Sequence, residues 1–353
     1  MRFEFDNNQR WIFDQAFIRH PVYGAILKEL AKQIVGYERE LLMLTMLFPA
    51  GGHAIMMANS GLGKTKISNC LPRVISGMKA ARVQGTPDAM PSSVIGYPVD
   101  TADGSRVWRP GQVPGGPEGT NFVLVDEGTR FTPRLWAAFL QMLEERKKTV
   151  EDRTENMPEV FVGVITANFP APGQGTVELP DATYDRLMLN LQWGYPSLDG
   201  MKEIIRRAQN LRKPDSEQIL EPVTDLAGIL AMRTEVEQLA TAASEQVVDY
   251  IARLTFGTNP HLNYMDAFTT KDGKPFKDYV AMGGSPRCGM DLKMASAALT
   301  HALGDDRIRP EHVKAVFPDV ARAHTKMGQL ANLGRKKVMV DDLITALLKG
   351  TQP

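Results

Sequence analysis

The segment ANSGLGKT, residues 58–65, has the residue types and spacing of a phosphate-binding turn. A short apolar run leads into a glycine-rich turn, and a Lys–Thr pair follows where a helix would begin. Backbone N–H groups of such a turn cradle phosphate oxygens, while Lys64 reaches the β- and γ-phosphates and the Thr65 hydroxyl ligates Mg²⁺. The full pattern has Gly where this chain has Ala58. We predict that ATP and Mg²⁺ are bound by Ser60, Gly61, Leu62, Gly63, Lys64, Thr65 and Lys66.

Two adjacent carboxylates, Asp126 and Glu127, end a second apolar run, NFVLVD at 121–126. Asp126 could hold Mg²⁺ through water, and Glu127 could polarise the water that attacks the γ-phosphate. In the simpler interpretation both are ordinary acids of a turn, or Asp126 caps a helix. Their place at the end of a strand, downstream of the phosphate-binding turn, favours the catalytic interpretation. The sequence therefore predicts an ATPase.

A polar residue, Asn168, follows a third apolar run, VFVGVITA at 160–167. The carboxyl ends of parallel strands face the ligand, so Asn168 could orient the attacking water. It could equally be a satisfied side chain in the turn before Pro170. The residues alone leave both interpretations open.

Buried strands alternate with helices in the part of the chain that holds these residues. The strands are expected at 54–58, 121–126, 160–167 and 188–193, with an amphipathic helix at 133–148. This alternation predicts an α/β domain with a parallel sheet. Residues 85–119 are rich in Gly and Pro, and Asp103-Gly104 lies between two strand-like runs, so this insertion is expected to carry a β-hairpin.

Strand signals fade after Pro196, and helical periodicity takes over. We predict an N-terminal helical and aromatic segment at 1–34, a nucleotide-binding domain at 35–196 and a helical domain at 197–353. Within the last domain the expected helices are 197–209, 224–240, 244–256, 286–303, 310–325 and 339–348.

Composition excludes several other classes of protein. The 353 residues are 43% hydrophobic and 23% charged, which argues against disorder, and 41 basic residues balance 41 acidic ones, which argues against a nucleic-acid coat. The two cysteines cannot form a disulfide framework, and no stretch approaches the length of a membrane span. We expect a cytoplasmic protein. The six histidines are dispersed in sequence, so Mg²⁺ is the only metal predicted.

Six segments resemble the MoxR family of AAA+ ATPases. They are QIVGYERE (33–40), GGHAIMMANSGLGKT (51–65), RVQGTPDAMPSSVIG (82–96), VDEGTRFTPRLWAAFLQMLEERKKTV (125–150), ITANFPAPGQGTVELPDATYDRLML (165–189) and GGSPRCGMDLKMASAALTHAL (283–303). The resemblance implies an AAA+ P-loop domain with a hairpin insertion, followed by an all-helical lid.

The resemblance also implies roles for individual residues. Lys64 and Thr65 are similar to the Walker A pair, Asp126 and Glu127 to the Walker B pair, and Asn168 to sensor 1. Arg186 resembles the arginine finger, which acts on the neighbouring subunit's γ-phosphate, and Arg287 resembles sensor 2, which touches the same phosphate. Ile34, Val35 and Gly36 resemble the residues that contact the adenine side of the nucleotide. Sites shared in this way imply a homo-oligomeric ring, expected to be a hexamer.

Family members remodel protein complexes in a chaperone-like manner, often beside a von Willebrand A-domain partner, and this is the function that the resemblance implies. A nucleic-acid motor of helicase or restriction type is the alternative, with basic triplets at 146–148 and 335–337. A scaffold that binds ATP without hydrolysing it is a third, which the intact Glu127 disfavours. In the insertion, Tyr97 and Trp108 either grip a substrate or pack the hairpin.

Overall fold

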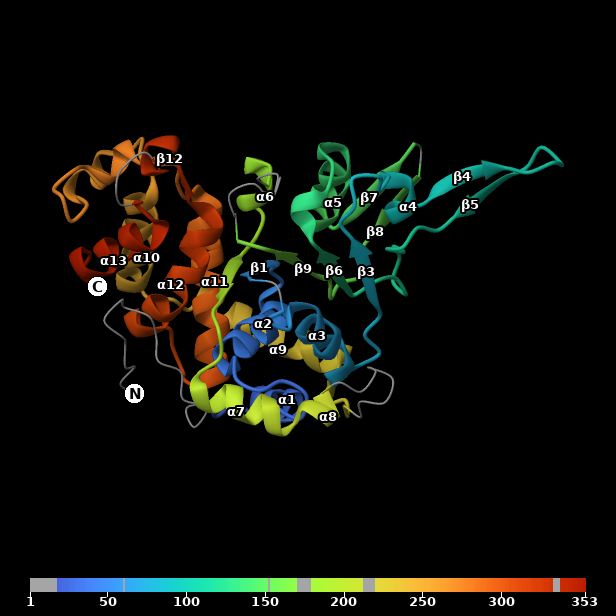
Figure 1. Ribbon diagram of the computed structural model, residues 1–353, viewed down its shortest axis with the longest axis horizontal. Coiled ribbons are helices and arrows are strands. Elements are labelled where there is room, and N and C mark those ends of the chain that lie inside the picture. Colours follow the sequence, from blue (N-terminus) through green and yellow to red (C-terminus); the bar gives the residue numbers. More distant parts are fainter. Residues whose placement is uncertain (1–17, 60, 152, 170–178, 212–219, 333–336) are drawn as a thin grey trace.

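Five parallel strands form the central sheet of the computed structural model, in the order β10–β1–β9–β6–β3 (Figure 1). The structure describes residues 18–59, 61–151, 153–169, 179–211, 220–332 and 337–353. The strands of the sheet are β1 (Ala54–Ala58), β3 (Ala80–Gln84), β6 (Phe122–Asp126), β9 (Val162–Ala167) and β10 (Leu189–Trp193).

Four of these strands coincide with the predicted ones, and β3 is an addition. Strands β1, β6 and β9 are almost wholly buried, so each is visible in the sequence as an apolar run. Strand β3 lies at the edge of the sheet, and Val83 is its one fully buried side chain. An edge strand with one buried residue has no apolar run to reveal it.

Helices cover both faces of the sheet, as its alternating side chains require. Ala54 and Met56 face a core that continues into the N-terminal and C-terminal helices, whereas Ile55 faces a second core under α5. The helices flanking the strands are α1 (Pro21–Leu30), α2 (Glu38–Ala50), α3 (Lys64–Cys70), α4 (Pro91–Ile95), α5 (Pro133–Glu145) and α6 (Asp181–Tyr184).

The C-terminal region is helical, as predicted, and it shares the first core with the sheet. Its helices are α7 (Leu198–Arg206), α8 (Ala208–Leu211), α9 (Leu226–Thr241), α10 (Glu245–Thr258), α11 (Pro286–Leu303), α12 (Pro310–His324) and α13 (Val340–Gly350). Helix α12 packs on β10, and α11 packs on α2 and α9. Short strands also occur here: β12 (Val280–Met282) pairs with β13 (Lys326–Met327), and β11 (Thr224–Asp225) pairs with β2 (Ile75–Ser76). Because one core spans residues 23–348, the domain limits at 34 and 196 remain predictions.

The predicted insertion forms helix α4 and a hairpin of β4 (Tyr97–Asp100) and β5 (Arg106–Arg109), which projects from the body (Figure 1). Residues 101–105 form its tip. There Gly104 has a φ of +81°, and the Asp103 carboxylate accepts hydrogen bonds from Thr101 and Ser105. The Asp–Gly signal therefore marked a real turn, though a longer one than a two-residue hairpin loop.

The helix predicted at 133–148 ends earlier, at Glu145. Arg146 takes a left-handed conformation (φ 54°), and the chain continues into a second hairpin of β7 (Lys147–Val150) and β8 (Arg153–Asn156). Arg146 donates to the carbonyls of Gly51 and Phe161, and Lys148 is buried. The triplet 146–148 is thus no exposed basic patch. In the triplet 335–337, only Lys337 lies within the described residues.

Candidate functional site

The phosphate-binding turn connects the carboxyl end of β1 to α3, which begins at Lys64. Gly61 and Gly63 have φ values of +83° and +79°, a conformation that strongly favours glycine. Ala58 is instead the last residue of β1, in register with Trp193, and its conformation is not left-handed. The departure from Gly at this position therefore costs the turn nothing. Ser60 lies outside the described residues.

The Lys64 ammonium lies between the ends of β1 and β9. It donates to the carbonyl oxygens of Ala58 (2.6 Å) and Ala167 (3.1 Å) and to Oδ1 of Asn168 (2.7 Å). Partial burial lowers the pKa of Lys64, although the charges of Asp126 and Glu127 oppose this. Asn168 is thus in direct contact with the lysine of the phosphate-binding turn.

Asp126 ends β6 opposite the start of α3. Its Oδ2 accepts from the Thr65 hydroxyl (3.3 Å) and from Arg82 (2.6 Å), and its Oδ1 accepts from Thr166 (2.6 Å). Although burial would raise the pKa of Asp126, these hydrogen bonds hold it below its usual value. The carboxylate is therefore charged and fixed beside Thr65, as a ligand set for Mg²⁺ requires. Arg82, on the missed strand β3, is a neighbour of this site that the sequence did not suggest.

Glu127 stands in a left-handed backbone conformation, with φ 55° and ψ 47°. Its N–H donates to the Thr166 hydroxyl (3.1 Å), and its carboxylate lies 3.2 Å from Arg130. A non-glycine residue in this conformation is strained by about 1–3 kcal/mol and persists where its surroundings hold it. Gly85 leaves room for this backbone, because a Cβ there would lie 2.1 Å from the Glu127 carbonyl oxygen. The Glu127 carboxylate is partly exposed beside the turn.

An apolar pocket of about 230 Å³ lies next to the phosphate-binding turn. Its lining includes Ile34 and Val35 from the turn before α2, Leu62, and Met201 and Ile204 from α7. Gly36 does not line it but has a φ of +78° and shapes the same turn. The predicted adenine side thus forms a pocket beside Gly61 and Gly63, suited to a flat apolar ring.

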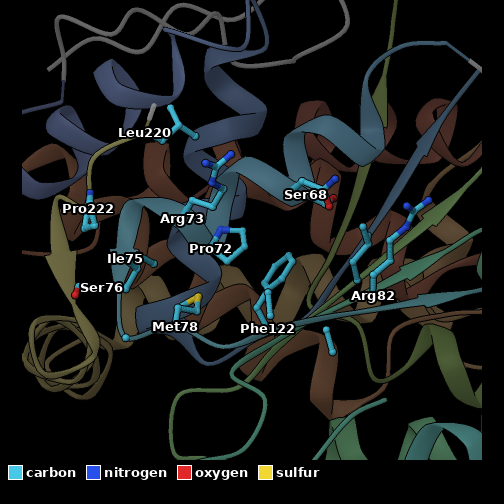
Figure 2. Close-up of a pocket in the computed structure, with 15 residues that line it drawn as sticks. Ser68, Pro72, Arg73, Ile75, Ser76, Met78, Arg82, Phe122, Leu220 and Pro222 are labelled. Atoms are coloured by element: carbon cyan, nitrogen blue, oxygen red, sulfur yellow. The ribbon is translucent and has the colours of Figure 1, made fainter. Parts of the chain in front are cut away.

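Another cavity, of about 560 Å³, lies beside the end of α3 and strand β3 (Figure 2). Arg73, Phe122 and Arg82 lie along it, together with Ser68 of α3. Neither Lys64 nor Thr65 lines this cavity, so it is separate from the nucleotide site. Arg82 connects the two, since its side chain also pairs with Asp126.

Arg186 and Arg287 lie together near the amino-terminal ends of the strands, at the end of the sheet opposite the phosphate-binding turn. Both guanidinium groups pair with Glu144 near the end of α5, and Arg287 also lies 3.5 Å from Asp185. The surrounding cavity, about 250 Å³, is lined by residues 51–53, which immediately precede β1. His53 fixes this corner: its ring bonds the Leu143 carbonyl and the Gly163 N–H, both at 2.9 Å. Burial lowers the pKa of His53 to about 3, so it is neutral.

The buried His324, at the end of α12, holds the arginine cluster to the C-terminal helices. Its Nδ1 contacts Asp185 (3.3 Å) and its Nε2 contacts Asp291 of α11 (3.0 Å). Asp185 also accepts from the Ser285 hydroxyl at 2.6 Å. Sequence reasoning missed His324, because it lies 139 residues from Asp185 and no local pattern links the two.

Comparisons with known proteins assign these motifs to a family. The family described as "ATPase family associated with various cellular activities (AAA)" matches residues 53–189. The chain is 30% identical to "Chaperone MoxR1" of Mycobacterium tuberculosis over 86% of this chain and 75% of that protein. The chain belongs to the MoxR family of AAA+ ATPases. The resemblance expected from the sequence is thereby confirmed.

Further relatives agree with the MoxR assignment. "Protein MoxR" of Methylorubrum extorquens is 26% identical over 91% of this chain and 92% of that protein. A crystal structure of a candidate ATPase from Cytophaga hutchinsonii covers 96% of both chains with a TM-score of 0.78 at 24% identity, which supports the fold alone. No helix in the described part of the chain is long and apolar enough to cross a membrane.

In this MoxR-family chain the two hairpins lie against each other. The Arg153 guanidinium of β8 stacks over the Trp108 ring of β5 at 4.7 Å, and Arg106 pairs with Glu151 at 2.8 Å. Trp108 therefore packs the hairpin. Tyr97 is 45% exposed and is the more accessible of the two aromatic residues.

Proposed function

We propose that this chain hydrolyses ATP with Mg²⁺ in a homo-oligomeric ring, and that each active site is shared between neighbouring subunits. Within one subunit, Lys64, Thr65, Asp126, Glu127 and Asn168 would form the hydrolytic half of the site. Arg186 and Arg287 of the neighbour would form the other half.

One observation carries this proposal: the arginines lie at the amino-terminal ends of the strands, and the phosphate-binding turn lies at their carboxyl-terminal ends. Residues 51–53 line the arginine cavity at the start of β1, whereas the turn leaves its end. The rise from Ala54 to Ala58 alone is about 13 Å at 3.3 Å per residue. An arginine side chain anchored to Glu144 does not span that distance to its own subunit's phosphates. A head-to-tail contact would bring it to a neighbour's.

The chemistry asks for positioning and charge stabilisation more than for covalent steps. Mg²⁺ prefers oxygen ligands, and the Thr65 hydroxyl and the Asp126 carboxylate offer them. When bound, the ion neutralises charge on the β- and γ-phosphates. Glu127 would polarise the attacking water and Asn168 would orient it. The neighbour's Arg186 and Arg287 would stabilise the charge that develops on the γ-phosphate.

We infer that the work done by this cycle is the remodelling of a protein complex. The name "Chaperone MoxR1" of the M. tuberculosis relative supports this inference. By resemblance to the family, we propose a hexamer and a von Willebrand A-domain partner. The nucleic-acid alternative loses one of its two candidate patches, since Arg146 and Lys148 point inward.

Mixing two inactive variants tests the shared site. We expect Glu127→Gln and Arg186→Ala each to lose ATPase activity, the latter by about 10³- to 10⁵-fold. In a random equal mixture about a quarter of the sites join an intact Glu127 to an intact Arg186, so about a quarter of wild-type activity should return. Wild-type specific activity should also rise with protein concentration.

Arg253→Ala serves as a control, because the ion pair of Arg253 in the described part of the chain is with Asp249 on its own helix. It should retain wild-type activity alone and add none to Glu127→Gln beyond its own. An active Arg186→Ala variant, or a mixture without recovery, would contradict the shared site. Stimulation of the wild-type ATPase by DNA would favour the nucleic-acid motor.

A further inference from the structure

Three side chains from distant parts of the chain meet near the end of α11. His20 precedes α1, Glu235 lies on α9 and His301 lies near the end of α11. One potential ligand atom from each lies within 4.8 Å of the other two. Although the histidines are dispersed in sequence, the fold brings two of them together. We propose that His20, Glu235 and His301 bind a divalent transition-metal ion of the Zn²⁺ type.

His301 is already oriented as metal-bound histidines usually are. Its Nε2 lies 2.7 Å from the Glu235 carboxylate, and its Nδ1 lies 3.4 Å from the Tyr23 hydroxyl. Metal-ligating histidines usually bond a polar group through their second nitrogen, which fixes the ring and its tautomer. The Tyr23 hydroxyl occupies that position here, so Nε2 is the nitrogen directed at the cluster.

His20 has an unsatisfied nitrogen beside this pair. Its ring centroid lies 4.3 Å from that of His301, and its Nδ1 is buried without a hydrogen-bond partner among the described residues. Buried polar atoms are rarely left unpaired, and such an atom calls for an explanation such as a bound ion. The hydrogen bond between His301 and Glu235 accounts for two of the three side chains. An ion accounts for all three.

The donor set selects the class of metal. Two imidazoles and one carboxylate suit Zn²⁺, Co²⁺ or Ni²⁺ better than Mg²⁺, which prefers oxygen alone. Glu235 is 57% exposed, so solvent reaches the cluster and water can complete a four-coordinate ion. Ligand distances of about 2.0–2.2 Å require the three side chains to close slightly around the ion.

Such an ion would fasten the N-terminal helix to the C-terminal ones. His301 lies fourteen residues after Arg287 on α11, which is about 21 Å along the helix axis. The ion therefore cannot take part in phosphate chemistry at Arg287. It would act on stability, since it binds the folded chain, in which three separate segments bring its ligands together.

Metal titration of the tag-free, full-length protein tests the site without recourse to ATPase activity. After chelator treatment and dialysis, Co²⁺ should give the visible spectrum of a four-coordinate ion, and Zn²⁺ should displace it at one ion per chain. Zn²⁺ at about a hundredfold excess over its Kd should raise the unfolding temperature by about 4 °C. His20→Ala and Glu235→Gln should each weaken binding by at least about tenfold, which cuts the temperature shift at the same Zn²⁺ concentration to about half or less.

Two matched variants are the controls. Glu237→Gln lies two residues further along α9, and His261→Ala removes an exposed histidine outside the cluster. Both should bind metal as the wild type does. Co²⁺ that stays fully hydrated in the presence of the wild type, or binding that survives both cluster substitutions, would overturn the proposal.

Discussion

His324 joins the C-terminal helices to the arginine cluster, and its replacement by Gln tests whether that junction depends on charge. Burial lowers the pKa of His324, but the hydrogen bonds and charges of Asp185 and Asp291 raise it more, so the net pKa lies above the ordinary value. The same hydrogen bond helps to hold the pKa of Asp185 below its usual value, against burial. A charged imidazolium between two carboxylates is the arrangement that these directions favour.

The expected cost of the substitution follows from the burial of the three groups. Removing one partner of a buried ion pair costs about 3–5 kcal/mol, because the other charge is left unpaired. The carboxylates here keep some contact with water, since Asp185 is 29% and Asp291 25% exposed. We therefore expect His324→Gln to lower the free energy of unfolding by about 2–3 kcal/mol at mildly acidic pH.

The sign of the pH dependence separates this account from one based on packing. A raised pKa means that the folded chain binds the proton more tightly than the unfolded chain, whose histidine pKa is about 6.5. The stabilisation by His324 is thus complete below that pH and is lost as pH rises through the folded pKa. Denaturant midpoints of wild type and variant should differ most at the acidic end and converge at the alkaline end. A gap that does not change with pH would refute the ion pair. His261→Gln, at an exposed histidine, should stay within about 0.5 kcal/mol throughout.

Two further substitutions test the neighbourhood of Asp126 and Glu127. Arg82→Gln frees the Asp126 oxygen that Arg82 now pairs with, so the Mg²⁺ concentration for half-maximal ATPase should fall about two- to fivefold. An unchanged or higher requirement for Mg²⁺ would show that Arg82 does not compete with the ion. Gly85→Ala would place a Cβ 2.1 Å from the Glu127 carbonyl oxygen and should cost about 1–3 kcal/mol and about a hundredfold in ATPase rate. Gly194→Ala, with open space at its Cβ, should be neutral in both assays, and an active Gly85→Ala variant would mean that Glu127 tolerates the shift.

The buried strands could be predicted from sequence because burial leaves a local signature. Strands β1, β6 and β9 are apolar runs in the sequence, and Gly61 and Gly63 indicate the turn after β1. The same reasoning failed where residues distant in sequence determine the surroundings of a side chain. Lys148 extends the helical pattern of 133–145, yet it is buried in β7 and donates to the carbonyls of Ile95 and Val113. Those acceptors lie 53 and 35 residues away, beyond any local window.

The residues of the candidate site also fall into two groups: those found from local motifs and those whose contacts are distant in sequence. Lys64, Thr65, Asp126 and Glu127 lie in short motifs whose geometry the neighbouring backbone dictates. Arg186 and Arg287 were identified through family resemblance alone. That both side chains converge on Glu144 required the fold, because 42 and 143 residues separate them from it. For the same reason no sequence pattern pointed to His324 or to the contact between His20 and His301.

Strand β1 and helix α5 both connect the end of the sheet that holds the phosphate-binding turn to the end that holds the two arginines. Strand β1 runs from residues 51–53, beside the arginines, to the phosphate-binding turn. Helix α5 starts shortly after Glu127, where the Thr132 hydroxyl caps it, and ends beside Glu144. His53 bonds the last turn of α5 to β9, so the two routes are coupled at the arginine end. Close-packed elements of this kind move as rigid bodies rather than deforming locally. If the site is shared as proposed, a shift at one subunit's γ-phosphate is carried by β1 and α5 to the arginines that serve the next nucleotide in the ring.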